Sequence, residues 1–386
     1  MLRLRMSTVA LVFLFPLPSV LGTSAEQSST EHGIEAIFQN LTDSQSPGIA
    51  VLVRENGRTV FERGYGVRDL HSKSTIDSHS NFRLASCTKQ FTAMAVMLLV
   101  HDGKLRYDER VTDVFPEFPD YGKAMTIRNL LNHTSGLPDY ESLMEEGSKS
   151  SRWNKNKQIH DVDVLDLLET QKHGKFAAGK QWSYSNSGYV VLGLVVVRVS
   201  GKSFPEFLHD RIFAPLGMDH TLAYVNGINE IPKRAYGHSR EGSRFFETDQ
   251  SATSATLGDG GVYSNIEDLA KWDDALAHHA LLSADEMQPA LMAVKLPDGS
   301  IPNWSSDPGD VDPLAGKPVF YGFGWFLDDY RGKPRMWHYG ETTGFRTAIE
   351  RFTEDKLTII ILSNRSDLNP DLLASQVADL YFRSHH

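Results

Sequence analysis

The sequence contains a single cysteine, Cys87, among its 386 residues, so no disulfide can form within the chain. Basic residues are also scarce: 39 Lys and Arg stand against 49 Asp and Glu, which gives a formal net charge of −10. Proteins that hold nucleic acid need clustered Lys and Arg for the phosphates. The charge therefore argues against nucleic acid as a partner and against electrostatic binding to anionic lipid.

Metal-binding motifs are missing as well. The sequence has no His-Glu-x-x-His and no clustered Cys and His, and its 15 histidines are scattered. We therefore expect no metal and no cofactor. Hydrophobic residues make up 40% of the chain and charged residues 23%, which is enough to form the core of one large domain or of two interleaved ones.

Long apolar runs are absent except for a short one near the N-terminus. Two arginines precede the apolar residues 9–15, prolines interrupt the run, and polar sequence begins at Thr23. A membrane-spanning helix needs roughly 20 apolar residues, so this layout is typical of a signal peptide cleaved after Ala25 or Gly22. We expect residues 1–25 to be a signal peptide, the protein to be secreted or periplasmic, and no stable membrane insertion to remain after cleavage. An uncleaved anchor is the alternative.

Strand patterns occur at both ends of the chain. Residues 48–53 and 59–64 flank Asn56-Gly57, which tolerates positive φ and predicts a hairpin. Residues 345–352 and 357–362 flank a polar turn, and helices are expected at 31–41 and 370–382.

The middle of the chain reads as mostly helical. Residues 91–100 are apolar on nearly every side and predict a buried helix that ends at Asp102-Gly103. The apolar run 190–199 leaves helix and strand open, and 297–318 reads as a surface loop. These patterns predict an α+β fold: an antiparallel sheet built from both chain ends and flanked by helices, with an inserted, mostly helical region. Within a domain at 26–386, we expect the α/β part at about 30–125 and 255–386 and the insertion at about 126–254.

The first motif with chemical meaning is Ser86-Cys87-Thr88-Lys89, at the start of the buried helix. A serine hydroxyl is a weak nucleophile and needs a neighbouring base. Helix positions three apart share a face, so Lys89 is expected beside Ser86, where burial would lower its pKa. A helix cap followed by a solvated lysine is the alternative. Cys87 is interpreted as a packing residue.

Two further motifs carry polar side chains. Tyr184-Ser185-Asn186 offers a phenol for proton relay and an amide for a substrate carbonyl or for the lysine, with a polar turn as the alternative. His338-Tyr339-Gly340 precedes the C-terminal strand pair. Its glycine would let substrate lie close to a strand edge, and a following backbone N–H would complete an oxyanion hole.

These three motifs occur in an order known from one superfamily. With them, the segments 130–138, 260–270 and 321–325 make the chain resemble the serine β-lactamase and penicillin-binding-protein superfamily, from about residue 46 to 362. The resemblance is strongest to the branch with a tyrosine in the second motif: class C β-lactamases, D-alanyl-D-alanine carboxypeptidases, D-aminopeptidases and related esterases. It implies a β-lactamase/transpeptidase-like fold.

The resemblance also implies roles for residues of this chain. Ser86 would be the acylated nucleophile, and Lys89 and Tyr184 would move its proton, with the identity of the general base left open. Asn186 would position the substrate amide and His338 would line the opposite wall. The resemblance further implies that the N–H groups of Ser86 and Glu341 form the oxyanion hole, next to Gly340, and that His133 belongs to a structural loop.

One departure bears on the substrate. Class C β-lactamases carry Lys-Thr-Gly as the third motif, whereas this chain has His338, which is mostly uncharged near neutral pH. We therefore expect a serine hydrolase that acts on a small ester or on a D-amino-acid or peptidoglycan-type peptide. A true β-lactamase and a penicillin-binding module with little turnover are the alternatives. Arg346 could replace the missing charge. The oligomeric state stays open.

Overall fold

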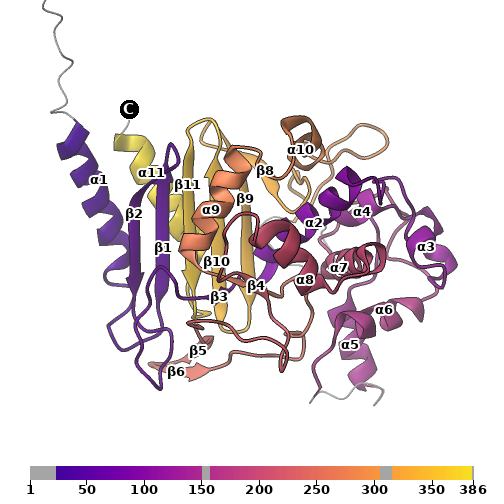
Figure 1. Cartoon of the computed structure of the whole chain (residues 1–386), viewed down its shortest axis with the longest axis horizontal. Coiled ribbons are helices and arrows are strands. Elements are labelled where there is room, and N and C mark those ends of the chain that lie inside the picture. The colour runs from indigo at the N-terminus through magenta and orange to yellow at the C-terminus, as the bar shows by residue number, and fades with distance from the viewer. Residues whose placement is uncertain (1–22, 150–156, 305–314, 385–386) are drawn as a thin grey trace, which may run out of the picture.

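The computed structural model describes residues 23–149, 157–304 and 315–384, so most of the expected signal peptide lies outside the described residues. At its centre is an antiparallel sheet in the order β2-β1-β11-β10-β9-β8 (Figure 1). The strands are β1 (Ile49–Glu55), β2 (Arg58–Tyr65), β8 (Phe326–Tyr330), β9 (Lys333–Thr342), β10 (Phe345–Phe352) and β11 (Leu357–Ser363). Because β1 pairs with β11, the two ends of the chain share one sheet, and the predicted α+β fold is confirmed.

The hairpins follow from their turn residues. Asn56 and Gly57 take φ values of 50° and 75° between β1 and β2, a conformation that Asn and Gly adopt at low cost. Strand β10 occupies the predicted residues, and β11 extends one residue beyond the prediction, to Ser363.

Two helices cover one face of this sheet. They are α1 (Thr23–Phe38) and α11 (Pro370–Ser384), and their apolar side chains form a core with alternate residues of β1, β10 and β11. Helix α1 begins earlier and ends earlier than the predicted 31–41. The opposite face packs against α9 (Ile266–Ala277) and the larger core.

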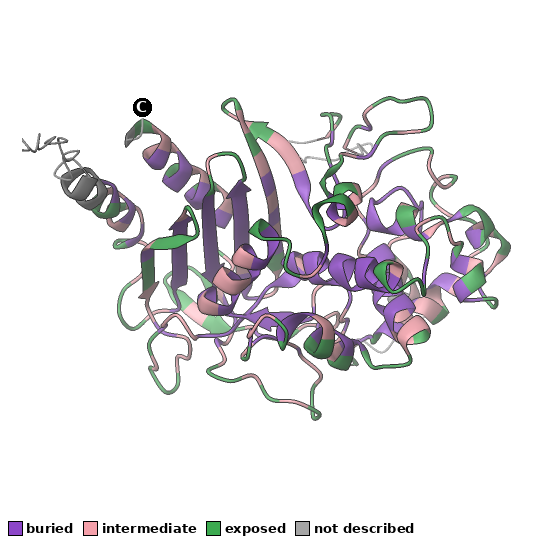
Figure 2. Ribbon diagram, turned by 45° about the horizontal axis from the view of Figure 1, so that its top comes forward, coloured by how far each residue is buried: buried purple, intermediate pink, exposed green. Residues whose placement is uncertain are grey.

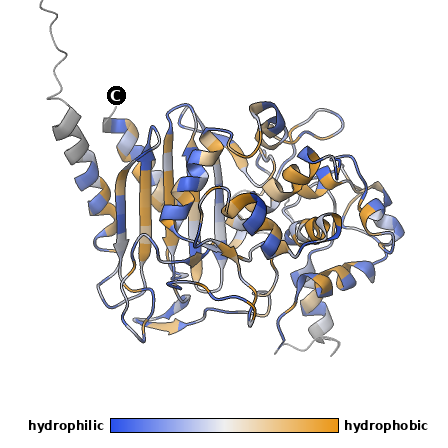
Figure 3. Cartoon of the chain, in the orientation of Figure 1, coloured by the Kyte–Doolittle hydropathy of each residue, from blue (hydrophilic) through white to orange (hydrophobic). Residues whose placement is uncertain are grey.

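The helical region is organised around α2 (Lys89–His101) and α7 (Asn186–Ser200), which pack together. Nearly every residue of α2 is buried, as predicted (Figure 2). The run 190–199, which the sequence left open, is helical in α7 and strongly hydrophobic (Figure 3). Its β-branched residues tolerate the helix because they are buried on several sides, and tertiary packing outweighs a weak propensity.

Shorter elements surround these two helices. The helical ones are η1 (Ala85–Thr88), α3 (Val111–Val114), η2 (Asp120–Ala124), α4 (Ile127–Leu131), α5 (Tyr140–Lys149), α6 (Asp161–Glu169), α8 (Phe204–Leu208), η3 (His209–Phe213) and α10 (Ala284–Leu291). The strands β3 (Phe82–Arg83), β7 (Val262–Ser264) and β4 (Leu222–Ala223) form a small sheet, and β5 (His238–Glu241) pairs with β6 (Arg244–Glu247). Three of these strands, β4, β5 and β6, lie within residues 126–254, the region that was predicted to be mostly helical. In the predicted loop 297–318, residues 305–314 lie outside the described part, and the described residues form no helix or strand.

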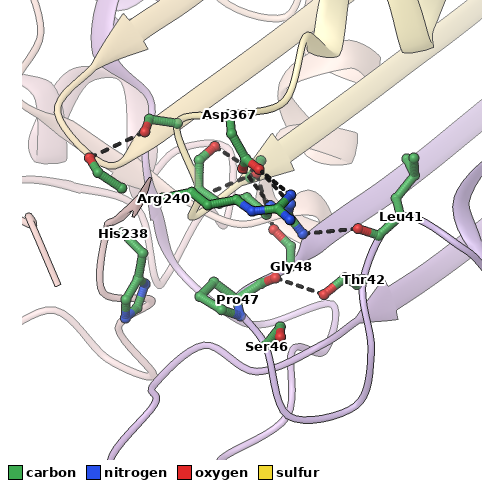
Figure 4. A network of polar contacts seen from close by, with 12 residues as sticks. Leu41, Thr42, Ser46, Pro47, Gly48, His238, Arg240 and Asp367 are labelled. Atoms are coloured by element: carbon green, nitrogen blue, oxygen red, sulfur yellow. Dashed lines mark hydrogen bonds and ion pairs between the residues drawn. The ribbon is translucent and has the colours of Figure 1, made fainter. Parts of the chain in front are cut away.

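A polar network fastens the segment after α1 to the end of β11 (Figure 4). Arg365 donates to the carbonyl of Leu41 at 2.9 Å and pairs with Asp367, which also accepts from Arg240. Asn364 accepts from the backbone N–H of Gly48 at 2.7 Å. The contacts of Arg365 with Leu41 and of Asn364 with Gly48 join segments more than 300 residues apart and so fix the start of β1 beside the end of β11.

Among the residues that the structure describes, no helix is both long and apolar enough to cross a bilayer.

Candidate active site

Ser86 lies in a tight turn that leads directly into α2. The turn is the 3₁₀ helix η1, and its residue Ala85 has a φ of +47°, a left-handed conformation that is uncommon outside glycine. The backbone of β9 holds this turn from the other side. A Cβ added to Gly340 would lie 2.1 Å from the carbonyl oxygen of Leu84. The glycine of the third motif therefore permits a close approach of β9 to the nucleophile turn. The close approach of substrate that the sequence suggested for Gly340 stays a prediction.

Lys89 occupies the first position of α2 and is fully buried. Its Nζ lies 3.2 Å from Ser86 Oγ, 2.9 Å from Asn186 Oδ1 and 3.0 Å from the carbonyl oxygen of Asp259. The expected proximity of Lys89 to Ser86 is thus observed, and the lysine is not solvated. Burial lowers the pKa of Lys89 to about 8, although the negative charge of Asp259 raises it.

Tyr184 lies just before α7, and the centre of its ring is 4.9 Å from Lys89 Nζ. Burial raises the pKa of the Tyr184 phenol well above its ordinary value, and a hydrogen bond with Ser86 lowers it in part. The phenol is therefore protonated near neutral pH, and its ring lies beside the candidate base.

Asn186 is the first residue of α7, one residue after the N-cap Ser185, whose hydroxyl accepts from the N–H of Gly188. The second motif therefore lies at the start of a helix. This position brings the Asn186 amide oxygen to the lysine at 2.9 Å. The structure thus brings the first two motifs together around Lys89.

His338 lies on β9 and is 2% exposed. Its Nδ1 is 2.6 Å from the carbonyl oxygen of Tyr339, and its Nε2 is 3.4 Å from the hydroxyl of Tyr321. Burial and the positive charge of Lys89 lower the pKa of His338 to about 3. The imidazole is therefore neutral at physiological pH, and its ring centre lies 6.2 Å from that of Tyr184.

Glu341 follows Gly340 on a stretch of β9 that β8 does not reach. Pairing between β8 and β9 ends at Trp337, so the outer edge of residues 338–342 has no strand partner among the described residues. The turn that holds Ser86 packs against the face of β9 at Gly340, where an added Cβ would meet Leu84 and Ala85. A backbone N–H donor on this edge is compatible with the oxyanion hole that the resemblance implied for Ser86 and Glu341.

Arg346 does not take the place of the missing charge in the third motif. It pairs across the strands with Glu341, and its guanidinium lies 2.6 Å from Glu341 Oε1. Residues opposite one another on antiparallel strands point to the same face. Arg346 therefore shares the face of Glu341, which alternates with His338 along β9 and is the face that α1 and α11 cover. The expectation that Arg346 contacts substrate is corrected accordingly.

An aromatic shell surrounds the second and third motifs, and most of its members were missed from the sequence. The ring of Phe326 lies 6.5 Å from Tyr184, in a stacked arrangement, and 5.4 Å from His338. His133 accepts a hydrogen bond from the N–H of Ser185 at 3.1 Å and contacts Tyr184. This placement fits the structural loop that the resemblance implied for His133. The other rings of the shell are Trp182, Tyr189, Trp304, Tyr321 and Trp337.

Cys87 is buried beside the site, and its Sγ lies 3.2 Å from the carbonyl oxygen of His338. Burial raises the pKa of its thiol, so the thiol is protonated and packs between η1 and β9. Asp259, whose carbonyl holds Lys89, was not singled out either. The sequence did contain a signal for Asp259, because this charged residue is surrounded by glycines in Leu257-Gly258-Asp259-Gly260-Gly261.

Comparison with known proteins gives concordant matches. The Beta-lactamase family model matches residues 34–380. Penicillin-binding protein 4* of Bacillus subtilis is 31% identical over 355 residues, covering 89% of this chain and 73% of that protein. The structure of D-amino acid amidase from Ochrobactrum anthropi SV3 complexed with L-phenylalanine amide has a TM-score of 0.74 at 24% identity, covering 93% of this chain and 100% of that one. EstCE1, a hydrolase with promiscuous acyltransferase activity, has a TM-score of 0.72 at 18% identity and the same coverage. At these identities the two structures show a shared fold.

Proposed function

Because this chain belongs to the Beta-lactamase family and is a serine hydrolase, we propose that it cleaves ester or amide bonds through an acyl-enzyme on Ser86. The observation that carries the proposal is the hydrogen bonding of Lys89. A neutral amine has two N–H donors and one lone pair. Two acceptors, Asn186 and the Asp259 carbonyl, take the donors and leave the lone pair directed at the hydroxyl of Ser86.

In this scheme Lys89 is the general base. With a pKa of about 8, a useful fraction of the amine is neutral near physiological pH. Tyr184 keeps its proton because its pKa is raised, so it is suited to pass a proton to the leaving group and not to start the reaction. Ser86 attacks the carbonyl carbon, its proton goes to Lys89, and the leaving group receives a proton through Tyr184. Water then hydrolyses the acyl-enzyme by the reverse proton path.

The charge distribution favours substrates without a carboxylate beside the scissile bond. His338 is neutral and Arg346 lies on the far face of the sheet. Neither supplies the fixed cation that a β-lactam carboxylate or a C-terminal carboxylate would need. A small ester, or an amide whose acyl part carries an amine, avoids that requirement.

Glu141 on α5 supports the amine-bearing alternative. Its side chain is exposed, and its charge interacts with Lys89 and Asp259. A carboxylate at this place would attract a cationic amine. Since a D-amino acid amidase shares the fold, D-phenylalanine amide is the first amide to test. Glu141→Gln should then raise the KM for that amide and leave p-nitrophenyl acetate unchanged, with Glu145→Gln, one turn further along α5, as the matched control.

The central experiment compares three substrates on the wild type and on Ser86→Ala: p-nitrophenyl acetate, D-phenylalanine amide and a fluorogenic penicillin. We expect turnover of the ester and the amide, an acyl adduct on Ser86 by mass spectrometry, and a loss of about a thousandfold or more in Ser86→Ala. Ser183→Ala is the control for a neighbouring hydroxyl.

Other results would identify the alternatives. Preferential hydrolysis of the penicillin would identify a β-lactamase, and Lys175, which donates to Ser183 Oγ at 3.4 Å, would be the next candidate for carboxylate binding. Stoichiometric acylation by penicillin without turnover of ester or amide would identify a penicillin-binding module.

We also propose that the protein is exported and loses residues 1–25. The support is the arginines, the short apolar run and the small residues before the expected cleavage site. Sequencing of the N-terminus of the protein recovered outside the cytoplasm should give Glu26 as the first residue. Recovery of an intact N-terminus from the membrane would instead indicate an uncleaved anchor.

A further inference from the structure

The segment 257–262 lies along one side of α2 and makes three hydrogen bonds there, two to residues of α2 and one to its N-cap residue Thr88. Thr92 Oγ1 donates to the carbonyl of Gly258 at 2.6 Å, Lys89 Nζ to that of Asp259 at 3.0 Å, and the N–H of Val262 donates to Thr88 Oγ1 at 3.1 Å. These three bonds fix Asp259 relative to the candidate base. The lysine and the aspartate are thus held together by backbone as well as by charge.

The carboxyl group of Asp259 is unusual for its burial. It is 6% exposed, and one of its oxygens accepts from the hydroxyl of Tyr140 at 3.1 Å. The other oxygen is buried and has no hydrogen-bond partner among the described residues. A buried carboxyl with one unsatisfied oxygen costs stability. A purely structural role would be served as well by an asparagine or a serine, so the charge itself calls for an explanation.

We propose that Asp259 is a positioning residue that acts through Lys89: its carbonyl holds the amine, and the charge of its side chain sets the pH range over which the enzyme works. This inference rests on the proposed function of Lys89 as the base for Ser86. Asp259 itself touches neither Ser86 nor substrate in this scheme. Its effect is transmitted by the electric field at the amine.

The direction of the effect follows from the charges. The charge of Asp259 stabilises the protonated amine and so raises the pKa of Lys89, against the larger effect of burial. Without that charge the amine would lose its proton at a lower pH. The titratable groups that surround the pair come from several elements: Cys87 on η1, His133 after α4, Tyr140 and Glu141 on α5, Asp161 on α6, Tyr184 and Tyr189 at α7, and His338 on β9. Of these, Glu141 also raises the pKa of Lys89 through its negative charge.

The test is the pH profile of kcat/KM for p-nitrophenyl acetate in Asp259→Asn, which keeps the shape of the side chain and removes the charge. We expect the acidic limb to move to lower pH by on the order of one unit, with the plateau at high pH retained. Tyr140→Phe is the matched control, because it removes the hydrogen bond and keeps the charge. Its limb should stay at the wild-type position.

A second measurement reports on Lys89 without turnover. In protein labelled with ¹³C at the lysine ε-carbons, the resonance that is missing in Lys89→Met should titrate at lower pH in Asp259→Asn than in the wild type. Asp259→Ser serves if the Asn variant does not fold. An unmoved resonance, or a limb that moves equally in Tyr140→Phe, would overturn the inference. Absence of Ser86-dependent ester hydrolysis in the wild type would instead refute the proposed function, and the resonance would still decide on Asp259.

Discussion

Gly340→Ala should slow acylation of Ser86 without touching any side chain of the proposed machinery. The added Cβ would lie 2.1 Å from the carbonyl oxygen of Leu84 and 3.3 Å from the Cβ of Ala85. Real Cβ atoms essentially never come within 3.0 Å of another heavy atom, so β9 and the nucleophile turn must separate by about 1 Å. The nearer obstacle, at Leu84, is backbone, which cannot rotate away.

That separation acts on the distance between Ser86 and the N–H of Glu341. A misplacement of about 1 Å in a catalytic constellation costs on the order of a hundredfold, and loss of one oxyanion donor costs a comparable factor. We therefore expect kcat/KM for p-nitrophenyl acetate to fall about a hundredfold in Gly340→Ala. The burst of nitrophenol should slow in parallel, because the acylation step is the one affected.

Gly332→Ala is the matched control, and Gly332 lies in the turn between β8 and β9. Gly332 has a φ of +81° and no atom within 4 Å of an added Cβ, so alanine there costs about 1 kcal/mol of stability through backbone strain and leaves the rate unchanged. Rates are compared well below both melting temperatures. If Gly340→Ala acylates as fast as Gly332→Ala, the close approach of β9 to the turn does not hold the oxyanion donor, and the reasoning fails.

Three further outcomes follow from the site and the core. Lys89→Ala and Tyr184→Phe should each reduce ester turnover on the order of a hundredfold, and the double variant should lose much less than the product, because the two share one proton path. In the wild type, kcat/KM should rise with pH through about 8, where Lys89 becomes neutral, with no inflection from His338 near 6.5, since its pKa is about 3. In urea unfolding, Asp273→Ala should cost about 3–5 kcal/mol, because it leaves the buried Arg351 without its carboxylate and removes one of the two carboxylates that pair with the buried Arg54. Asp274→Ala, whose side chain is 44% exposed, should cost much less.

Local signals explain why the sheet could be predicted from the sequence. The turn at Asn56-Gly57 and the apolar residues on either side of it specify β1 and β2, and a polar turn separates β10 from β11 in the same way. The proximity of Ser86 to Lys89 is local too, since it requires only helical spacing. The run 190–199 was undecidable because its nearly unbroken apolar sequence carries no clear periodicity, and burial of most of its residues is a tertiary property.

The contacts that define the charge around Ser86 are not local. Strand β10 is buried on both faces along most of its length, so its hydrophobic pattern does not tell which face Arg346 takes. Only the register with β9, which sets Arg346 opposite Glu341, decides it, and a shift by one residue would turn the guanidinium to the side of His338. Asp259 presents the same difficulty, because it reaches Lys89 across 170 residues of sequence. Arg346, which the sequence indicated as a source of charge, therefore points away from the side of His338. Asp259, which the sequence analysis did not single out, instead places a negative charge near Lys89. For both residues the sequence identifies the charge of the side chain but does not show toward which part of the site the side chain points. That orientation determines which charges act on Ser86 and Lys89.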